Sequence, residues 1–182
     1  MSVMTACFTG HRPAALCGYD RSRYVNFIYA LRNELAKLPI DRFISGGAQG
    51  FDQLAFWSVY ELAKYKPRVK NILVLPFETF GQQWPAQGCF SQADLALCKQ
   101  SATEIHILPN QAGVRALFQR NHAMVDMSDM VIALYENDAW PYAKGGTAEC
   151  MRYAASHSKQ LLQIRYETES GQLTLKGLER IR

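Results

Sequence analysis

The sequence has neither a long hydrophobic run nor a large excess of charge. Its longest apolar run, near residues 72–77, is far shorter than the roughly 20 residues that a membrane-spanning helix needs. Twenty lysines and arginines against sixteen aspartates and glutamates leave a net charge of only +4. The densest basic stretch, residues 64–70, is typical of a solvated helix end. We therefore expect neither a membrane protein nor the basic surface of a nucleic-acid binder.

The cysteines lack the spacing of a disulfide framework or a zinc site. They number five, an odd count, and none forms a CxxC pair. The first residues show no basic segment followed by a long apolar one, so we expect no signal peptide. These absences predict reduced thiols and a cytoplasmic protein. Nothing in the sequence calls for a metal or an organic cofactor.

What the sequence does have is an ordinary globular composition, with 48% hydrophobic, 12% aromatic and 20% charged residues. A length of 182 residues favours one domain with a sizeable core. We find no internal repeat, low-complexity segment or linker. The expected domain covers residues 1–166, and residues 167–182 are either an extension of the same domain or a tail.

Short apolar runs alternate with segments of helical periodicity along most of the chain. The runs expected as strands cover residues 3–9, 42–45, 71–75, 104–108, 130–134 and 160–164. The segments expected as helices lie near residues 24–38, 51–62, 92–99, 114–128 and 147–157. Repeated strand–helix–strand units predict an α/β fold, a mostly parallel sheet covered by helices on both faces. Ligands of such folds bind beyond the carboxyl ends of the strands, so we expect the functional residues in the loops that follow the strands.

The loop after the first predicted strand, residues 9–13, combines a flexible turn with a cation. Gly10 allows a sharp turn, and the planar guanidinium of Arg12 suits a phosphate or a carboxylate. The alternative is a plain turn with a solvent-exposed arginine. His11 is either a ligand contact or a structural hydrogen-bonding group.

The loop after the second predicted strand, residues 45–52, is rich in glycine and leads directly into a helix. Such a turn lets backbone N–H groups approach an anion at the positive end of the helix. The loop is neither a Walker A motif nor a G-x-G-x-x-G fingerprint. Asp52 either stabilises the start of the helix or binds a ribose hydroxyl.

Aromatic side chains follow the third predicted strand. Phe77, Phe80 and Trp84 come after Pro76, where an apolar ring is able to stack on a base. The favoured alternative is that these rings simply cover the core.

A second glycine turn, residues 145–147, lies after the fifth predicted strand and also opens a helix. Two such turns at the same edge of a sheet predict a bipartite site for a phosphate-bearing ligand. On the preceding helix, Asn121 interrupts the apolar stripe beside Arg120. Either Asn121 bridges loop backbones inside the core, or Arg120 and Asn121 both point into the crevice. Arg12, Arg120 and Lys144 are the cations nearest to the glycine turns.

The order of these motifs resembles the SLOG superfamily, the group that contains the Smf/DprA and Lonely-guy proteins. The motifs are TGHRP, SGGAQGFD, LPFE, RN with VIALY, and GGTAE, and they extend over roughly residues 4–164. The resemblance is strongest to the YpsA-like branch. It implies a single Rossmann-like three-layer α/β/α domain that binds a nucleotide or a nucleotide derivative, as a sensor or a processing module.

Lonely-guy proteins are phosphoribohydrolases that cleave the N-glycosidic bond of a nucleoside 5′-monophosphate. Arg120 resembles their arginine, and residues 145–147 resemble their glycine loop. Here the glycines follow Lys144 instead of a proline, and Glu149 stands two residues after Thr147 instead of three. Cys150 occupies the expected place of the glutamate, and one helical position is about 100° of rotation.

Three functions follow. The first is the binding of a nucleotide or an ADP-ribose-like ligand through the glycine turns, which the imperfect catalytic motif favours. The second is a phosphoribohydrolase that uses Arg120, Glu149 and Asp52, since two carboxylates suit glycosidic cleavage. The third and least favoured is a DprA-like binder of single-stranded DNA, which needs a basic groove with stacking aromatics. The Lonely-guy resemblance also implies a homodimer. The residues expected to bind the ligand are Gly10, His11, Arg12, Ser45, Gly46, Gly47, Gln49, Gly50, Asp52, Pro76, Phe77, Asn121, Gly145, Gly146 and Thr147.

Overall fold

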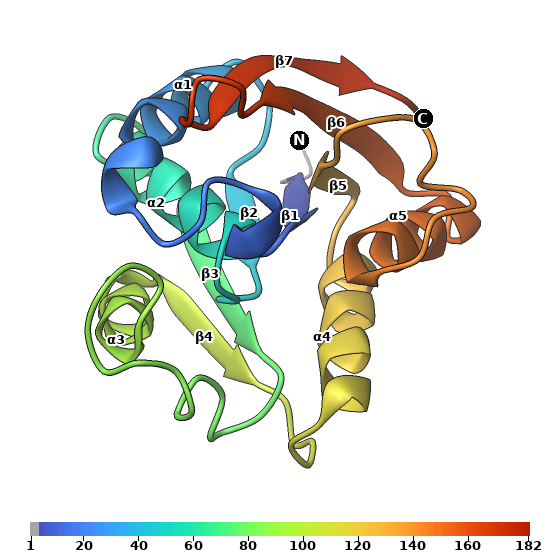
Figure 1. The fold of residues 1–182 in the computed structure, drawn as a ribbon. Coiled ribbons are helices and arrows are strands. Elements are labelled where there is room, and N and C mark those ends of the chain that lie inside the picture. Colours follow the sequence, from blue (N-terminus) through green and yellow to red (C-terminus); the bar gives the residue numbers. More distant parts are fainter. Residues whose placement is uncertain (1–3) are drawn as a thin grey trace.

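Seven strands form a single sheet in the computed structural model, which describes residues 4–182 (Figure 1). The strands are β1 (Thr5–Gly10), β2 (Arg42–Ser45), β3 (Lys70–Leu75), β4 (Glu104–Ile107), β5 (Met130–Leu134), β6 (Gln160–Glu167) and β7 (Thr174–Arg180). They lie in the order β4-β3-β2-β1-β5-β6-β7. Neighbours among β1–β6 are parallel, and only β7 is antiparallel. Val3, where the first strand was expected to begin, lies outside the described residues.

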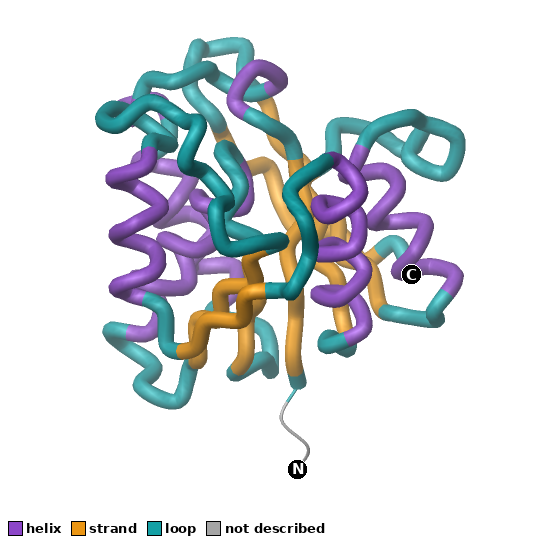
Figure 2. The backbone as a smooth tube through the Cα atoms, turned by 90° about the horizontal axis from the view of Figure 1, so that it is seen from below, coloured by secondary structure: helices purple, strands orange, loops and turns teal. Residues whose placement is uncertain are grey.

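Helices cover both faces of the sheet, as Figures 1 and 2 show. They are α1 (Val25–Leu35), α2 (Phe51–Ala63), α3 (Gln92–Ser101), α4 (Val114–Asp126) and α5 (Gly146–Ser156), with short 3₁₀ turns η1 (Pro13–Ala15) and η2 (Arg21–Arg23). In Figure 1, α1, α2 and α3 lie on one side of the sheet, and α4 and α5 lie on the other. The predicted three-layer α/β/α architecture is therefore confirmed. Among the described residues, no helix is long and apolar enough to cross a bilayer.

The core explains why the sequence folds in this way. All five residues of β5 are buried, as expected for a strand with helices on both faces. In α1, Phe27, Leu31 and Leu35 repeat every four residues and are each at most 1% exposed. This spacing places them on one face of the helix, which packs against α2 and the sheet.

The C-terminal segment adds the strand β7, which the sequence did not predict as a strand. It pairs with β6 in antiparallel register, with an irregularity between Arg165 and Tyr166. Its residues are partly buried or exposed, and its sequence, TLKGLER, has no continuous apolar run of the kind that β3 and β5 have. Leu173, just before β7, is 1% exposed and its N–H bonds the carbonyl of Arg23. The residues after 166 thus belong to the same sheet.

The stability of the layer formed by α1 and α2 depends on Phe51, the first residue of α2. Its ring is fully buried and makes edge contacts with Phe8 and Phe27, at centroid distances of 6.0 and 6.3 Å. We expect Phe51→Ala to lower the free energy of unfolding by about 3–5 kcal/mol, because it opens a cavity. Urea denaturation measures the loss. Tyr65→Ala, at a ring that is 73% exposed, is the control and should change stability by less than about 0.5 kcal/mol. Equal losses would contradict this account.

Candidate functional site

A cleft of about 190 Å³ opens where the order of the sheet reverses, at the carboxyl ends of β1 and β5. Strand β1 lies between β2 and β5, so the chain proceeds from β1 toward one edge of the sheet and later returns to the other side of β1. Ligands of open α/β sheets bind at such a switch point. The cleft is lined by Thr9, Gly10, His11, Arg12, Ala48, Asp52, Arg120, Asn121, Tyr135, Lys144, Gly145, Gly146, Thr147 and Ala148.

Arg120 is the central cation of this cleft. Although it comes from the middle of α4, it is only 3% exposed. Its Nη1 donates a hydrogen bond to the carbonyl of Gly46 and lies 3.5 Å from Oδ2 of Asp52. Its Nε donates to Oδ1 of Asn121 at 2.9 Å. Burial lowers the pKa of Arg120, and the charge of Asp52 opposes this shift.

The same contacts settle which of the two neighbouring residues is buried. Arg120 is buried, whereas Asn121 is half-buried and turns its amide oxygen toward the guanidinium. Both residues line the cleft. Arg120, and not Asn121 as the first alternative had it, therefore bridges to the β2–α2 loop inside the protein.

The amino end of α5 forms the opposite wall. Gly145 precedes the helix with φ of +110°, a conformation that favours glycine. Within the described part of the chain, no side chain caps this end. Its first N–H groups and its positive dipole therefore face the cleft, which residues 144–148 line. Lys144 adds an exposed cation beside them.

The first glycine turn, by contrast, packs against the protein itself. The carbonyl of Gly46 bonds Arg120, and a Cβ at this position would overlap the guanidinium. A Cβ at Gly50 would lie 2.5 Å from the carbonyl oxygen of His11. That carbonyl already accepts a hydrogen bond from the N–H of Phe51, the first residue of α2, at 3.1 Å. The amino end of α2 thus holds the loop after β1, and the two glycine turns differ in what they face.

His11 makes a contact that the sequence did not predict. Its Nε2 lies 2.6 Å from Oε2 of Glu136, and its ring lies 5.1 Å from that of Tyr135. Glu136 is the second residue after β5. This position, in a loop that follows a strand, is the signal in the sequence that could have identified it as a site residue. A carboxylate bonded to a histidine that lines the cleft is an arrangement able to orient the ring for hydrogen bonding to a ligand.

Glu149 lies elsewhere. Its Oε1 is 2.6 Å from Nε2 of His122, whose ring stacks on Tyr153 with 3.7 Å between centroids. It is not among the residues that line the cleft. Cys150 is buried, and burial raises the pKa of its thiol, so this residue is an unreactive core side chain.

The aromatic loop after β3 belongs partly to the core. Phe77 and Phe80 are 9% and 5% exposed and pack with the residues beneath α3, which agrees with the favoured covering role. Trp84 is half-buried against Phe80, at a centroid distance of 5.1 Å. These rings also line a groove of about 600 Å³ beside the cleft, which we call the aromatic groove. Its lining is Arg12, Pro13, Ala14, Tyr19, Gln49, Phe77, Thr79, Phe80, Gln83, Trp84, Ala112, Gly113, Val114 and Leu117.

The structure thus divides the residues that the sequence singled out. Those that line the cleft are Gly10, His11, Arg12, Asp52, Arg120, Asn121, Lys144, Gly145, Gly146 and Thr147. Those that line the aromatic groove are Arg12, Gln49, Phe77, Phe80 and Trp84. Among the described residues, those that line neither are Ser45, Gly46, Gly47, Gly50, Pro76 and Glu149. Lining residues that the sequence did not single out include Thr9, Ala48, Tyr135 and Ala148. Within residues 4–182, no three His, Cys, Asp or Glu side chains gather so as to hold a metal ion.

Comparison with known proteins places the chain in a family. The model of the YpsA family, described as the YspA SLOG family, matches residues 6–168. The chain belongs to this SLOG family. The resemblance drawn from its motifs is therefore confirmed.

Two curated relatives of this SLOG protein are similar in sequence. The uncharacterised SPbeta prophage-derived protein YoqJ of Bacillus subtilis (strain 168) is 31% identical over 122 residues, which are 62% of this chain and 68% of that protein. A UPF0398 protein of Latilactobacillus sakei subsp. sakei (strain 23K) is 28% identical over 116 residues, or 61% of each chain.

Solved structures of DNA processing protein A (DprA) share the fold. The protein from Streptococcus pneumoniae superposes with a TM-score of 0.60 at 14% identity, covering 93% of this chain and 53% of that one. The protein from Helicobacter pylori, solved for its single-stranded DNA binding mode, has a TM-score of 0.52 at 16% identity. That match covers 87% of this chain and 63% of the other. The SLOG chain thus spans between half and two thirds of each DprA chain.

The pair formed by Arg120 and Asp52 is expected to support the fold as well as the cleft. Arg120→Met leaves the Asp52 carboxylate buried without its cation, so we expect the free energy of unfolding to fall by about 3–5 kcal/mol. The double variant Arg120→Met/Asp52→Asn removes both charges and should recover part of this loss. Urea denaturation at pH 7 measures both effects. A double variant less stable than Arg120→Met alone would show that the two side chains are not coupled in this way.

Proposed function

We propose that this SLOG protein binds a nucleotide or a nucleotide derivative, with a phosphate of the ligand in the cleft at the carboxyl ends of β1 and β5. The observation that carries the proposal is the uncapped amino end of α5, which lines a cleft whose side chains include three cations and one carboxylate. Backbone N–H groups at a helix start, together with the helix dipole, favour a bound phosphate. Family membership gives independent support for a ligand of this class.

The cations of the cleft favour an anionic ligand, even though one of them is partly compensated by a carboxylate. Asp52 pairs with the buried Arg120, so the guanidinium of Arg120 is partly compensated. Arg12 and Lys144 are exposed and belong to opposite walls, the loop after β1 and the turn before α5. A phosphate between them would accept hydrogen bonds from both side chains and from the N–H groups of α5. The positive charge that recognises the ligand is therefore local, and the net charge of +4 plays little part in it.

Calorimetric titration with AMP, ADP-ribose and NAD tests the proposal. We expect at least one of them to bind, and we expect Arg12→Ala to weaken binding about tenfold or more through the loss of charged hydrogen bonds. Gly146→Asp should abolish binding, because it places a carboxylate where the phosphate would lie. The matched control is Arg68→Ala, an exposed arginine outside the cleft, which should bind as the wild type does. Failure of all three ligands to bind would overturn the proposal.

Hydrolysis of a nucleoside monophosphate is the second candidate, and one observation bears against it. The carboxylate of Glu149 is bonded to His122 and does not line the cleft. Glycosidic cleavage requires a carboxylate close to the sugar carbon. The orientation of Glu149 therefore argues against cleavage and leaves ligand binding as the favoured function.

An assay of free base released from a panel of nucleoside 5′-monophosphates separates the two functions. We expect no release by the wild type and unchanged ligand affinity in Glu149→Gln. Release that Glu149→Gln abolishes would establish the phosphoribohydrolase and show that the carboxylate turns into the cleft. Release that survives this substitution would point instead to Asp52 or to His11 and Glu136.

Binding of single-stranded DNA, the mode named for the Helicobacter pylori neighbour, has less support. Such binding needs cations along a groove that follows the backbone, together with stacking aromatics. The aromatic groove contains rings, but Arg12 is the one charged residue among its described lining residues. We therefore propose a small ligand rather than a strand.

A further inference from the structure

The aromatic groove adjoins the cleft and differs from it in chemistry. The cleft alone, at about 190 Å³, is smaller than typical small-molecule sites, which measure about 300–1,000 Å³. The groove adds about 600 Å³ and is mostly apolar, whereas the cleft is mostly polar. A ligand that filled both would carry an anionic group at one end and a planar apolar group at the other.

We propose that the aromatic groove holds the base of the nucleotide whose phosphate occupies the cleft. This inference rests on the proposed function and specifies the second half of its ligand. The aromatic side chains of Trp84 and Tyr19 and the apolar side chain of Val114 line the groove. Stacking on such side chains accepts any base, because every base has a π-face. The groove thus selects a planar ring, and the cleft selects the phosphate.

Helix α4 joins the two compartments. Val114 and Leu117 line the groove, and Arg120 and Asn121 line the cleft. Their spacing of three or four residues places them along one side of the helix. From Leu117 to Asn121 the helix rises about 6 Å, a distance that one ribose can span. Arg12 lines both compartments, so it lies at the junction where the sugar would sit.

A second contact connects the compartments beneath the ligand. The guanidinium carbon of Arg120 lies 6.0 Å from the centre of the Phe80 ring, within reach of a cation–π attraction. Phe80 forms part of the floor of the groove and packs against Trp84. The residue at the centre of the cleft and the aromatic floor of the groove are therefore parts of one packed unit.

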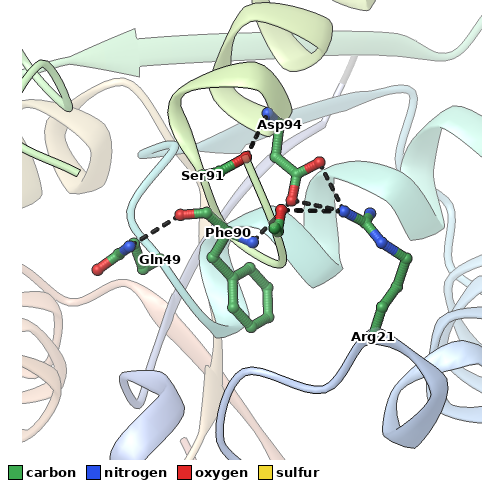
Figure 3. Close-up of polar contacts among 6 residues, drawn as sticks. Arg21, Gln49, Phe90, Ser91 and Asp94 are labelled. Atoms are coloured by element: carbon green, nitrogen blue, oxygen red, sulfur yellow. Dashed lines mark hydrogen bonds and ion pairs between the residues drawn. The ribbon is translucent and has the colours of Figure 1, made fainter. Parts of the chain in front are cut away.

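The Tyr19 side of the groove is held in place by a hydrogen-bond network shown in Figure 3. Tyr19 packs edge-on against Phe90, at a centroid distance of 6.3 Å. Asp94 accepts the backbone N–H of Phe90 at 2.6 Å and pairs with Arg21 at 2.8 Å. Gln49, which also lines the groove, donates to the carbonyl of Phe90 at 2.8 Å.

These bonds hold Phe90 with φ of +58°, a conformation that an aromatic residue rarely adopts. Such a backbone persists only where its surroundings constrain it, and constrained positions of this kind gather at ligand sites. Phe90 does not itself line the groove, but the network fixes Gln49 and the ring against which Tyr19 packs, and both of these residues line it. A preformed wall lowers the entropy that binding costs.

The experiment compares whole nucleotides with a ligand that lacks the base. Calorimetry measures the affinity of the full chain for AMP, GMP, CMP and UMP, and for ribose 5-phosphate. We expect at least one nucleotide to bind about tenfold or more tightly than ribose 5-phosphate, because stacking adds to the phosphate contacts. Tyr19→Ala and Trp84→Leu should each weaken that nucleotide about fivefold or more and leave ribose 5-phosphate unchanged.

Matched controls separate this inference from the proposed function. Tyr65→Ala removes a tyrosine that is 73% exposed and lies outside the groove, and it should change neither affinity. Thermal melting shows whether each variant is folded. Because the Tyr19 side chain is 58% exposed, Tyr19→Ala should lower stability less than Trp84→Leu does.

Two outcomes would overturn the base subsite alone: equal affinity for nucleotides and ribose 5-phosphate, or a nucleotide affinity that both groove variants leave unchanged. If neither the nucleotides nor ribose 5-phosphate bind, and ADP-ribose and NAD also fail to bind, the proposed function fails together with the base subsite. Tighter binding of a single-stranded oligonucleotide than of any mononucleotide would overturn the small-ligand proposal.

Discussion

The buried guanidinium of Arg120 is the group on which the candidate site depends. It joins α4 to the β2–α2 loop through the Gly46 carbonyl and Asp52, and it lies at the centre of the cleft. A buried cation is tolerated only when charges and hydrogen bonds compensate it. The glycine at position 46 is part of that compensation, since a side chain there would displace the guanidinium. The shape of the loop is thus a requirement of one charge.

This arrangement gives the two glycine turns different tasks. The turn before α2 is used inside the protein, where its helix start bonds the loop after β1. The turn before α5 keeps its helix start free of side-chain caps and lines the cleft. The glycines of the first turn therefore build the site, whereas the glycines before α5 line the cleft directly. Sequence patterns do not distinguish these tasks, because both turns consist of glycines before an amphipathic helix.

The two compartments beside Arg120 are also the reason why we propose ligand binding instead of catalysis. The cleft and the aromatic groove share α4 and Arg12, and together they offer a charged end and an apolar end. The carboxylate that a hydrolase would need is bonded to His122 outside the cleft. Under the proposed function, a site with this division of chemistry would recognise a nucleotide by its two ends.

Much of the fold was predictable from the chain. Apolar runs marked β1 to β6, most continuously in β3 and β5, and stripes such as Phe27, Leu31 and Leu35 marked the helices. The strand β7 was not predicted, because polar residues and Gly177 interrupt its apolar positions and leave no apolar run to mark it. Loops after strands also predicted where the site lies, since parallel strands bring their carboxyl ends to one edge of the sheet.

By itself, the sequence determined the α/β class, the SLOG family and most of the residues that line the cleft. Only the tertiary structure decided which of Arg120 and Asn121 is buried, where Glu149 points and that Glu136 meets His11. The reason is physical. Local periodicity specifies elements and their faces, whereas a side chain's partner is set by distant segments, such as residues 46 and 120, that meet only when the sheet is assembled.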